Sequence, residues 1–313
     1  RSHSPMKIVV MGSGGVGGYF GARLAAAGND VTFVARGAHL DAMRRDGLRL
    51  DSELGSLHLA AVGAVADARE IPAADAIIFA VKLRDTESAA GSLKALAAGG
   101  TAIFTFQNGV ESGARIGRVV GPGHVVEGAA RISAHIAEPG VIRHVGNFAV
   151  LEFGEADGSA SPCVSAFHAA CAAAGIAAKV SDRIARTIWA KFAMLAPLSG
   201  LTALTRGPIG PVRANPKSRA LLEAAVAEVV ALGVALKTGL EPEDAARTMK
   251  VIDGLPGGMI ASMCHDLTAG KPIEVEGLSG AVARLAEEHG VPAPTHTFIA
   301  AALAPFVDGK PQV

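Results

Sequence analysis

The stretch KIVVMGSGGVG, from Lys7 to Gly17, joins an apolar run to a cluster of glycines. The four successive apolar residues Ile8–Met11 are typical of a strand buried on both faces of a parallel sheet, because such strands are continuous rather than alternating. Gly12, Gly14 and Gly17 then have the G-x-G-x-x-G spacing of a dinucleotide-binding turn. We therefore predict a strand, a turn and a helix that together bind a dinucleotide.

Each glycine of this spacing has a separate expected role. Gly12 makes the tight turn, Gly14 lets the backbone approach a pyrophosphate, and Gly17 lets the helix pack closely on the strand. The pyrophosphate is expected at the helix N-terminus, where unpaired N–H groups and the positive dipole end favour an anion. The alternative is a glycine-rich turn of another α/β unit, since the chain holds 38 glycines. The predicted cofactor contacts in this loop are Gly12, Ser13, Gly14, Gly15, Val16 and Gly17.

The residues after the loop complete a βαβ unit. Tyr19–Ala27 is compatible with a helix, Gly28–Asp30 stops it, and Val31–Val34 is a β-branched and aromatic second strand. Arg36 lies 19 residues after Gly17, where an NAD-binding site would place Asp or Glu on the ribose 2′-hydroxyl. A guanidinium there favours NADP(H), because it can pair with the 2′-phosphate. The alternative for Arg36 is an exposed loop arginine.

Length and composition indicate a folded protein of two domains, or of one domain with a large extension. With 313 residues, 50% of them hydrophobic and 19% charged, the chain has ample material for a core. The formal net charge of zero predicts no attraction to nucleic acid or to an anionic membrane. The longest apolar candidate for a membrane span, Leu221–Leu236, is interrupted by Glu223 and Glu228, and no secretory apolar segment precedes the glycine loop. Arg1–Pro5 is expected to be a leader before a natural start at Met6.

The cysteines and histidines indicate neither a disulfide nor a metal site. Cys163, Cys171 and Cys264 form no C-x-x-C pair, and we expect them to be reduced thiols in a cytoplasmic protein. The ten histidines show no H-E-x-x-H or similar metal-binding spacing. We therefore predict that the protein binds no metal.

Polar side chains follow two further buried strands. Asp75–Val81 is expected to be a strand that ends at Lys82, and Thr101–Phe106 is followed by Gln107 and by Asn108-Gly109. Residues just beyond the carboxyl ends of strands form the ligand crevice of an open α/β sheet, so these side chains are expected at the same edge as the glycine loop. The alternative for Asn108-Gly109 is an ordinary turn, since both residues tolerate positive φ.

The rest of the first half predicts an extension of this sheet. His124–Glu155 alternates, with a turn at Glu138–Gly140, and is expected to form antiparallel strands. Ser161–Gly175 is typical of a helix with an N-cap and a glycine stop, and Ile176–Val180 of a last strand. The predicted first domain is therefore an α/β, Rossmann-type dinucleotide-binding domain of residues 6–181.

Strand signals largely cease after residue 181. Helices are expected from Asn215 to near Gly239, over Glu241–Leu255 and over Glu274–His289. No Ser/Gly-rich linker marks the boundary. We predict an all-helical C-terminal domain of residues 182–313 that supplies the substrate pocket and the catalytic acid of a dehydrogenase.

Lys191 is a candidate for that acid. It lies in the otherwise apolar stretch Ile188–Leu195, next to the only tryptophan, Trp189. The alternative is a lysine whose stem packs on apolar neighbours while its ammonium stays in water.

Taken together, the motifs resemble the ketopantoate reductase (2-dehydropantoate 2-reductase) family. The resemblance runs from about Met6 to about Thr297, and the motifs keep the family's order. They are the Met-Lys-Ile start with Gly12–Gly17, Arg36, Val81-Lys82, Gln107-Asn108-Gly109, Glu138-Pro139-Gly140 with Arg143-His144, Trp189-Ala190-Lys191-Phe192, Leu201-Thr202-Ala203-Leu204, Ser262-Met263 with Asp266, and Ile273-Glu274.

The resemblance implies NADPH-dependent reduction of a 2-oxo acid to a 2-hydroxy acid, which in the family gives pantoate for pantothenate and coenzyme A synthesis. Lys191 matches the family's general acid. An ammonium can stabilise the negative charge that builds on the carbonyl oxygen and can donate the proton. A partly desolvated site is expected to lower the pKa of this lysine from its free value of about 10.4.

The resemblance also implies roles for other residues. Glu274 matches the carboxylate that orients the distal hydroxyl of the substrate, although a carboxylate at a helix start is also explained by the dipole. Asn108 matches an amide that touches cofactor and substrate, Lys82 a cofactor contact, and Ala134 a backbone contact to the cofactor. The hydroxyl groups of Ser199 and Ser262 are expected to contact the substrate.

The chain departs from the family where asparagines line the substrate pocket. Leu195 and Ser199 stand four and eight residues after Lys191, and Met259 stands three residues before Ser262. Each lost hydrogen bond to a buried polar substrate costs about 1–3 kcal/mol, so two or three losses predict a kcat/KM lower by roughly two orders of magnitude. Either other groups rebuild the pocket or the substrate is less polar than ketopantoate.

Three functions are therefore open on the sequence alone. They are a ketopantoate reductase, a reductase of a more apolar 2-oxo acid with the same lysine chemistry, and an NADP-binding sensor without turnover. The 3-hydroxy acid dehydrogenases also combine a Rossmann domain, a helical domain and a catalytic lysine. The motifs around Lys191 and Glu274 favour the ketopantoate reductase family instead. The expected partner is a small 2-oxo acid. A homodimer is left open, because no apolar stripe identifies an interface.

Overall fold

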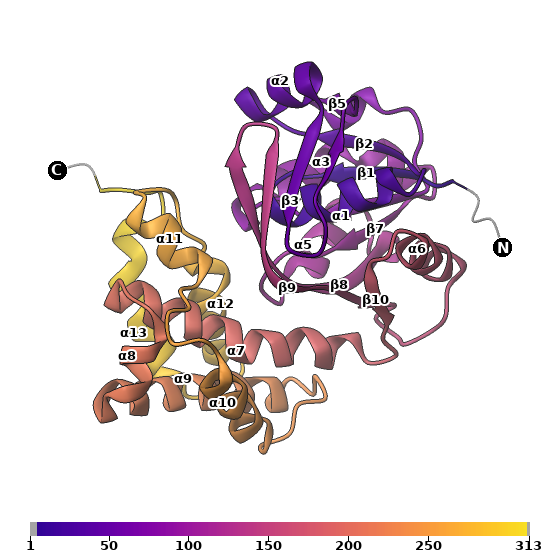
Figure 1. Ribbon diagram of the computed structural model, residues 1–313. Coiled ribbons are helices and arrows are strands. Elements are labelled where there is room, and N and C mark those ends of the chain that lie inside the picture. Colours follow the sequence, from indigo (N-terminus) through magenta and orange to yellow (C-terminus); the bar gives the residue numbers. More distant parts are fainter. Residues whose placement is uncertain (1–4, 312–313) are drawn as a thin grey trace. The chain divides into compact units, whose positions relative to one another are not determined.

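The computed structural model describes residues 5–311, which form two compact units (Figure 1). The first unit runs to Gln107 and resumes over Glu111–Ile184, and the second holds Asn108–Val110 and the chain from Ala185 onward. Most of the expected leader, residues 1–4, lies outside the described part. We keep the sequence-based limits, 6–181 and 182–313, as a proposal for the two domains.

The centre of the first unit is a parallel sheet. Its four central strands lie in the order β7-β6-β1-β2, which is the doubly wound arrangement expected for a dinucleotide-binding fold. These strands are β1 (Lys7–Met11), β2 (Asp30–Val34), β6 (Ala76–Phe79) and β7 (Ala102–Thr105).

Strand β1 is buried on both faces, as its apolar run predicts. Ile8 and Val10 belong to the apolar cluster that includes residues of α1 and α6, whereas Val9 and Met11 pack with residues of α3, α4 and α5. Helices therefore cover both faces of the sheet, which is why the central strands do not alternate. These helices are α1 (Gly15–Ala26), α3 (Thr86–Ser92), α4 (Lys94–Ala98), α5 (Ser112–Val120) and α6 (Pro162–Ala173).

A long hairpin extends the sheet beyond β7. Strand β8 (Val125–Glu138) pairs parallel with β7 and antiparallel with β9 (Val141–Gly154), and Gly140 adopts φ +77° at the turn between them. The expected last strand is β10 (Ala177–Val180), which pairs with β9.

Four further elements of the first unit had no clear sequence signal. Strand β3 pairs parallel with β9 and antiparallel with β4, and β5 pairs with β2 at the other edge. These strands are only three to five residues long, so their pairing depends on partners far along the chain. The elements are helix α2 (Gly37–Asp46) and strands β3 (Leu48–Ser52), β4 (Leu57–Leu59) and β5 (Gly63–Val65).

The second unit contains only helical elements within the described residues. Its longest helix, α7, is apolar enough to span a membrane by length and composition, but 61% of its most apolar window is buried, as in a core helix. The helices are α7 (Ile184–Thr205), α8 (Ile209–Ala214), α9 (Pro216–Ala235), α10 (Asp244–Gly254), α11 (Ser262–Thr268), α12 (Ser279–Glu288) and α13 (Pro294–Leu303).

One predicted helix start is wrong. Glu274 does not open a helix but precedes the 3-10 turn Val275–Gly277, and α12 begins only at Ser279. Leu278, with φ −112° and ψ −99°, separates the two segments. An interaction of Glu274 with the dipole of α12 therefore does not explain this carboxylate, because the dipole acts only within the first turn.

Candidate functional site

The glycine loop after β1 has the backbone that its spacing predicts. Gly12 adopts φ +96°, and a Cβ at this residue would lie 2.7 Å from the amide nitrogen of Val81. A Cβ on Gly17 would lie 2.1 Å from the carbonyl oxygen of Gly12. The turn and the close approach of α1 to β1 both exclude larger residues at these positions.

The glycine loop is open at Gly14 and tightly packed at Gly15. A Cβ on Gly14 would have no heavy atom of another segment within 4 Å, whereas one on Gly15 would lie 2.1 Å from the carbonyl oxygen of Ala134. Strand β8 therefore closes the loop at Gly15, and the backbone at Gly14 is open. Helix α1 starts at Gly15, so unpaired N–H groups lie next to this open space. An anion such as a dinucleotide pyrophosphate fits this arrangement.

Ser13 and His39 hold the loop in place. The Ser13 hydroxyl donates to the carbonyl of Val34 at 2.9 Å. The amide of Gly140 donates to Nδ1 of His39 at 3.0 Å, so Nε2 carries the proton and donates to the carbonyl of Ser13 at 2.9 Å. Burial holds the pKa of His39 below its usual value, so the ring stays neutral at neutral pH. Sequence reasoning did not identify His39, because a single histidine on a helix carries no motif.

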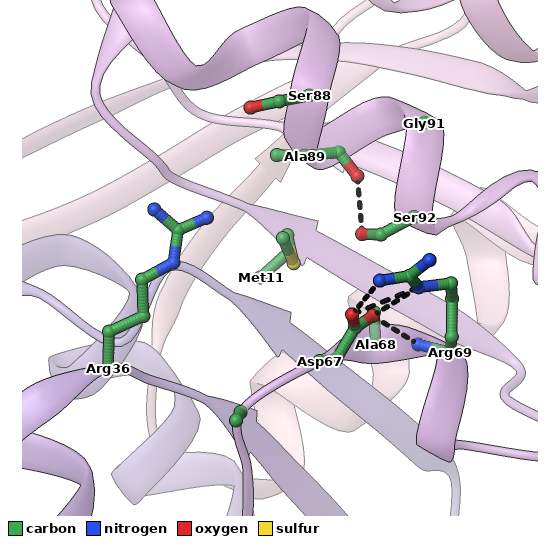
Figure 2. A pocket seen from close by; sticks show the side chains of 10 residues that line it. Met11, Arg36, Asp67, Ala68, Arg69, Ser88, Ala89, Gly91 and Ser92 are labelled. Atoms are coloured by element: carbon green, nitrogen blue, oxygen red, sulfur yellow. Dashed lines mark hydrogen bonds and ion pairs between the residues drawn. The ribbon is translucent and has the colours of Figure 1, made fainter.

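Arg36 follows β2 and lines a pocket of about 310 Å³ in the first unit (Figure 2). Met11 at the end of β1 and Asp67 after β5 also line this pocket. Lys82 is exposed after β6, where it precedes a 3-10 turn. The predicted cofactor residues Gly12–Gly17, Arg36 and Lys82 thus all lie beyond the carboxyl ends of strands in the first unit.

Asn108 belongs to the second unit although it almost directly follows β7. Its Oδ1 accepts a hydrogen bond of 2.9 Å from Nζ of Lys191 on α7. Both side chains are half-buried. The structure thus brings Lys191, the candidate general acid, into contact with Asn108, the residue matched to an amide that touches cofactor and substrate.

The other candidate substrate residues differ in accessibility. Ser262 is exposed at the first position of α11, and Glu274 is half-buried. Ser199 is only 1% exposed, and its hydroxyl is buried without a hydrogen-bond partner among the described residues. A substrate could reach this hydroxyl only after neighbouring side chains moved. Leu195, one turn after Lys191, and Met259 are both half-buried apolar residues packed against the core of the second unit.

Within residues 5–311, no group of three or more His, Cys, Asp or Glu side chains is placed to hold a metal ion.

The doubly wound sheet, the open glycine loop and a lysine with an amide partner define a class of protein, the nicotinamide-dependent oxidoreductases with a Rossmann-type unit.

Comparison with known families gives the particular group. The family model described as ketopantoate reductase PanE/ApbA matches residues 8–158, and its C-terminal counterpart matches residues 183–306. The chain belongs to the ketopantoate reductase family.

Individual relatives agree with this assignment. The chain is 32% identical to the 2-dehydropantoate 2-reductase of Mesorhizobium japonicum, with 93% of this chain and 94% of the relative covered. It is 29% identical to that of Halobacterium salinarum, with 92% and 95% covered. The crystal structure of a PanE/ApbA family ketopantoate reductase from Ralstonia eutropha superposes with a TM-score of 0.88 at 29% identity, covering 97% and 99% of the two chains.

The fold also occurs with another activity. A D-mandelate dehydrogenase solved with NADH and anilino(oxo)acetate superposes with a TM-score of 0.87 at 21% identity, covering 97% and 98% of the chains. This likeness concerns the fold alone. Family membership makes the protein an NADP(H)-dependent oxidoreductase that acts on CH–OH groups, and its substrate is a small 2-oxo acid.

Proposed function

We propose that this enzyme reduces 2-dehydropantoate to pantoate with NADPH, a step of pantothenate and coenzyme A synthesis. The observation that carries the proposal is the 2.9 Å hydrogen bond between Lys191 and Asn108, because it joins the residue matched to the general acid to the residue matched to the amide that touches cofactor and substrate. The curated relatives named 2-dehydropantoate 2-reductase support the substrate.

Lys191 is the proposed general acid. When bound, NADPH supplies the hydride. The Lys191 ammonium stabilises the negative charge that develops on the former carbonyl oxygen and donates a proton to it. The Asn108 side-chain oxygen accepts one of the three ammonium protons and so fixes where the others point.

The remaining contacts are assigned from the resemblance to the family and from the chemistry of the groups. The loop Gly12–Gly17 would hold the pyrophosphate, Arg36 the 2′-phosphate, and Lys82 and the backbone of Ala134 further parts of the cofactor. Asn108, Ser262 and Glu274 would hold the substrate, and the buried Ser199 hydroxyl would join them only after neighbouring side chains moved. Glu274 would accept a hydrogen bond from the distal hydroxyl of ketopantoate, and its half-buried position suits a partly desolvated contact.

The apolar side chains of Leu195 and Met259 favour a second candidate, which is reduction of a more apolar 2-oxo acid. Leu195 follows Lys191 by one turn, and Met259 packs against the same core, so neither can donate a hydrogen bond to a substrate hydroxyl. The D-mandelate dehydrogenase structure has the same fold, so the fold by itself does not select between polar and apolar 2-oxo acids.

The first test measures NADPH oxidation at 340 nm with ketopantoate and a panel of 2-oxo acids. Lys191→Ala is expected to lower kcat by about 10²–10⁴-fold, since a general acid contributes that much. Lys217→Ala, at an exposed lysine of α9, is the matched control and should keep full activity.

The outcomes separate the candidates. Efficient turnover of ketopantoate supports the first function, and a higher kcat/KM for an apolar 2-oxo acid replaces it with the second. NADPH binding without reduction of any 2-oxo acid would contradict both and favour a sensor role.

We propose a cytoplasmic location and a small-molecule substrate, without nucleic-acid or membrane partners. The three cysteines are free in the structure, which suits a reducing compartment. A homodimer stays a proposal whose test is the molar mass in solution.

A further inference from the structure

The pocket at Arg36 contains a second arginine that the family resemblance does not assign. Figure 2 shows Arg36 at one side of the pocket and Arg69 at the other, with Asp67 next to Arg69. Arg36 follows β2, and Asp67 and Arg69 follow β5, the neighbouring edge strand. The two arginines thus reach one pocket from adjacent strand ends.

Asp67 fixes the direction of the Arg69 side chain. Nε of Arg69 donates to Oδ1 of Asp67 at 3.0 Å and to Oδ2 at 2.9 Å, and a terminal nitrogen of Arg69 also donates to Oδ2. The Arg69 backbone amide donates to Oδ1 at 2.9 Å, and the Glu70 carboxylate accepts from the amide of Asp67 at 3.1 Å. This capping box makes a short turn that holds Arg69 from both backbone and side chain.

The charges of the pocket favour an anion. Arg69 lowers the pKa of Asp67 to about 2, mainly through its side-chain hydrogen bonds, and the positive charge of Arg36 adds to the shift. Asp67 is therefore ionised at neutral pH and neutralises one of the two guanidinium groups. The Arg69 side chain is 75% exposed, so part of its donor set stays accessible to a ligand. Among the residues that line the pocket, one positive charge remains in excess.

We propose that Arg69 is a second guanidinium that binds the 2′-phosphate of NADPH, facing Arg36 across the pocket and positioned by Asp67. This inference rests on the proposed assignment of Arg36. A phosphate monoester carries three acceptor oxygens, so it can accept from two guanidinium groups at once. A free ribose 2′-hydroxyl can accept only weakly from them. Arg69 would therefore raise the preference for NADPH over NADH rather than the affinity for both.

The experiment measures the dissociation constants of NADPH and NADH by quenching of protein fluorescence. Arg69→Ala is expected to raise the dissociation constant for NADPH about tenfold and to leave that for NADH within twofold, since a charge-assisted hydrogen bond is lost from one ligand only. Arg45→Ala is the matched control, because Arg45 also pairs with an adjacent aspartate in the first unit but does not line the pocket. Equal changes for both cofactors, or no change, would overturn the proposal.

A double variant separates contact from charge neutralisation. Arg69→Ala exposes the Asp67 carboxylate, which by itself would repel a phosphate. In Asp67→Asn with Arg69→Ala this repulsion is absent. If Arg69 binds the phosphate, the preference for NADPH stays about tenfold below wild type; if it returns to the wild-type value, Arg69 only neutralises Asp67 and the proposal fails.

Arg36→Ala distinguishes this failure from failure of the cofactor assignment. If Arg36→Ala lowers the preference for NADPH but Arg69→Ala does not, only the role of Arg69 is refuted. If neither variant changes the preference, the 2′-phosphate binds elsewhere, and the assignments of both Arg36 and Arg69 are refuted together.

Discussion

His39 is the residue that connects the glycine loop to the hairpin of β8 and β9. Its two ring nitrogens bond to the Ser13 carbonyl and to the Gly140 amide, which are separated by more than a hundred residues in the chain. We expect His39→Ala to raise the NADPH dissociation constant several-fold, because each lost bond contributes about 0.5–1.5 kcal/mol to the order of the loop.

Fluorescence titration with NADPH measures this effect. The kcat at saturating NADPH should stay within about twofold, since His39 is a positioning residue and Lys191 is in the other unit. A fall in kcat with unchanged NADPH affinity would contradict the positioning role.

At the scale of elements, α7 presents Lys191, Leu195 and Ser199 at intervals of four residues. Residues at this spacing lie on one face of a helix, so the side chain at position 195 is one turn from the proposed acid. Leu195→Asn places an amide there. We expect kcat/KM for ketopantoate to rise about tenfold relative to an apolar 2-oxo acid, the value of roughly one hydrogen bond to a polar substrate.

The steady-state ratio of kcat/KM for the two acids measures this change. Leu221→Asn is the matched control, because Leu221 is 49% exposed on α9 and its replacement should leave the ratio unaltered. An unchanged ratio in Leu195→Asn would place the substrate away from this turn of α7.

The segment around Glu274 illustrates the limit of sequence patterns for single elements. The composition of Glu274–His289 predicts one helix, but the backbone has a 3-10 turn before Leu278 and a helix only from Ser279. The amide of Ile273 is bonded to the carbonyl of Val307, close to the C-terminus. A partner this distant in the sequence contributes no local pattern, so the helix start could not be predicted correctly.

At the scale of the whole molecule, two histidines whose pKa values are lowered make stability depend on pH. His296 is 0% exposed, and its ring bonds to the Ser279 hydroxyl and the Ala225 carbonyl. Burial holds its pKa below the usual 6.5, and the pKa of His39 is lowered in the same direction. As pH falls through about 6.5, the unfolded chain takes up protons that the folded protein does not, so stability must fall.

We expect the free energy of unfolding to decrease between about pH 7.5 and pH 5.5, by up to about 1.4 kcal/mol per pH unit for each such histidine. Urea unfolding at several pH values measures this slope. His296→Gln should flatten it, whereas His289→Gln, at an exposed histidine after α12, should not. A slope that stays the same in His296→Gln would contradict the assignment.

The sequence by itself determined the class of fold and most of its central elements. A continuous apolar run such as Ile8–Met11 is a property of neighbouring residues, and a glycine at position 12 or 17 reflects a local backbone requirement, so both can be recognised without a structure. The motifs likewise predicted the family, and the family models that match residues 8–158 and 183–306 confirm it.

Only the tertiary structure decided which distant residues meet. The hydrogen bond between Lys191 and Asn108 joins residues that are 83 positions apart. His39 bonds to residues 26 and 101 positions away, and Arg36 and Arg69, which share a pocket, are 33 positions apart. The same holds for the short strands β3 to β5, which form because they pair with other strands of the sheet. Such contacts depend on long-range packing, and no local spacing encodes them.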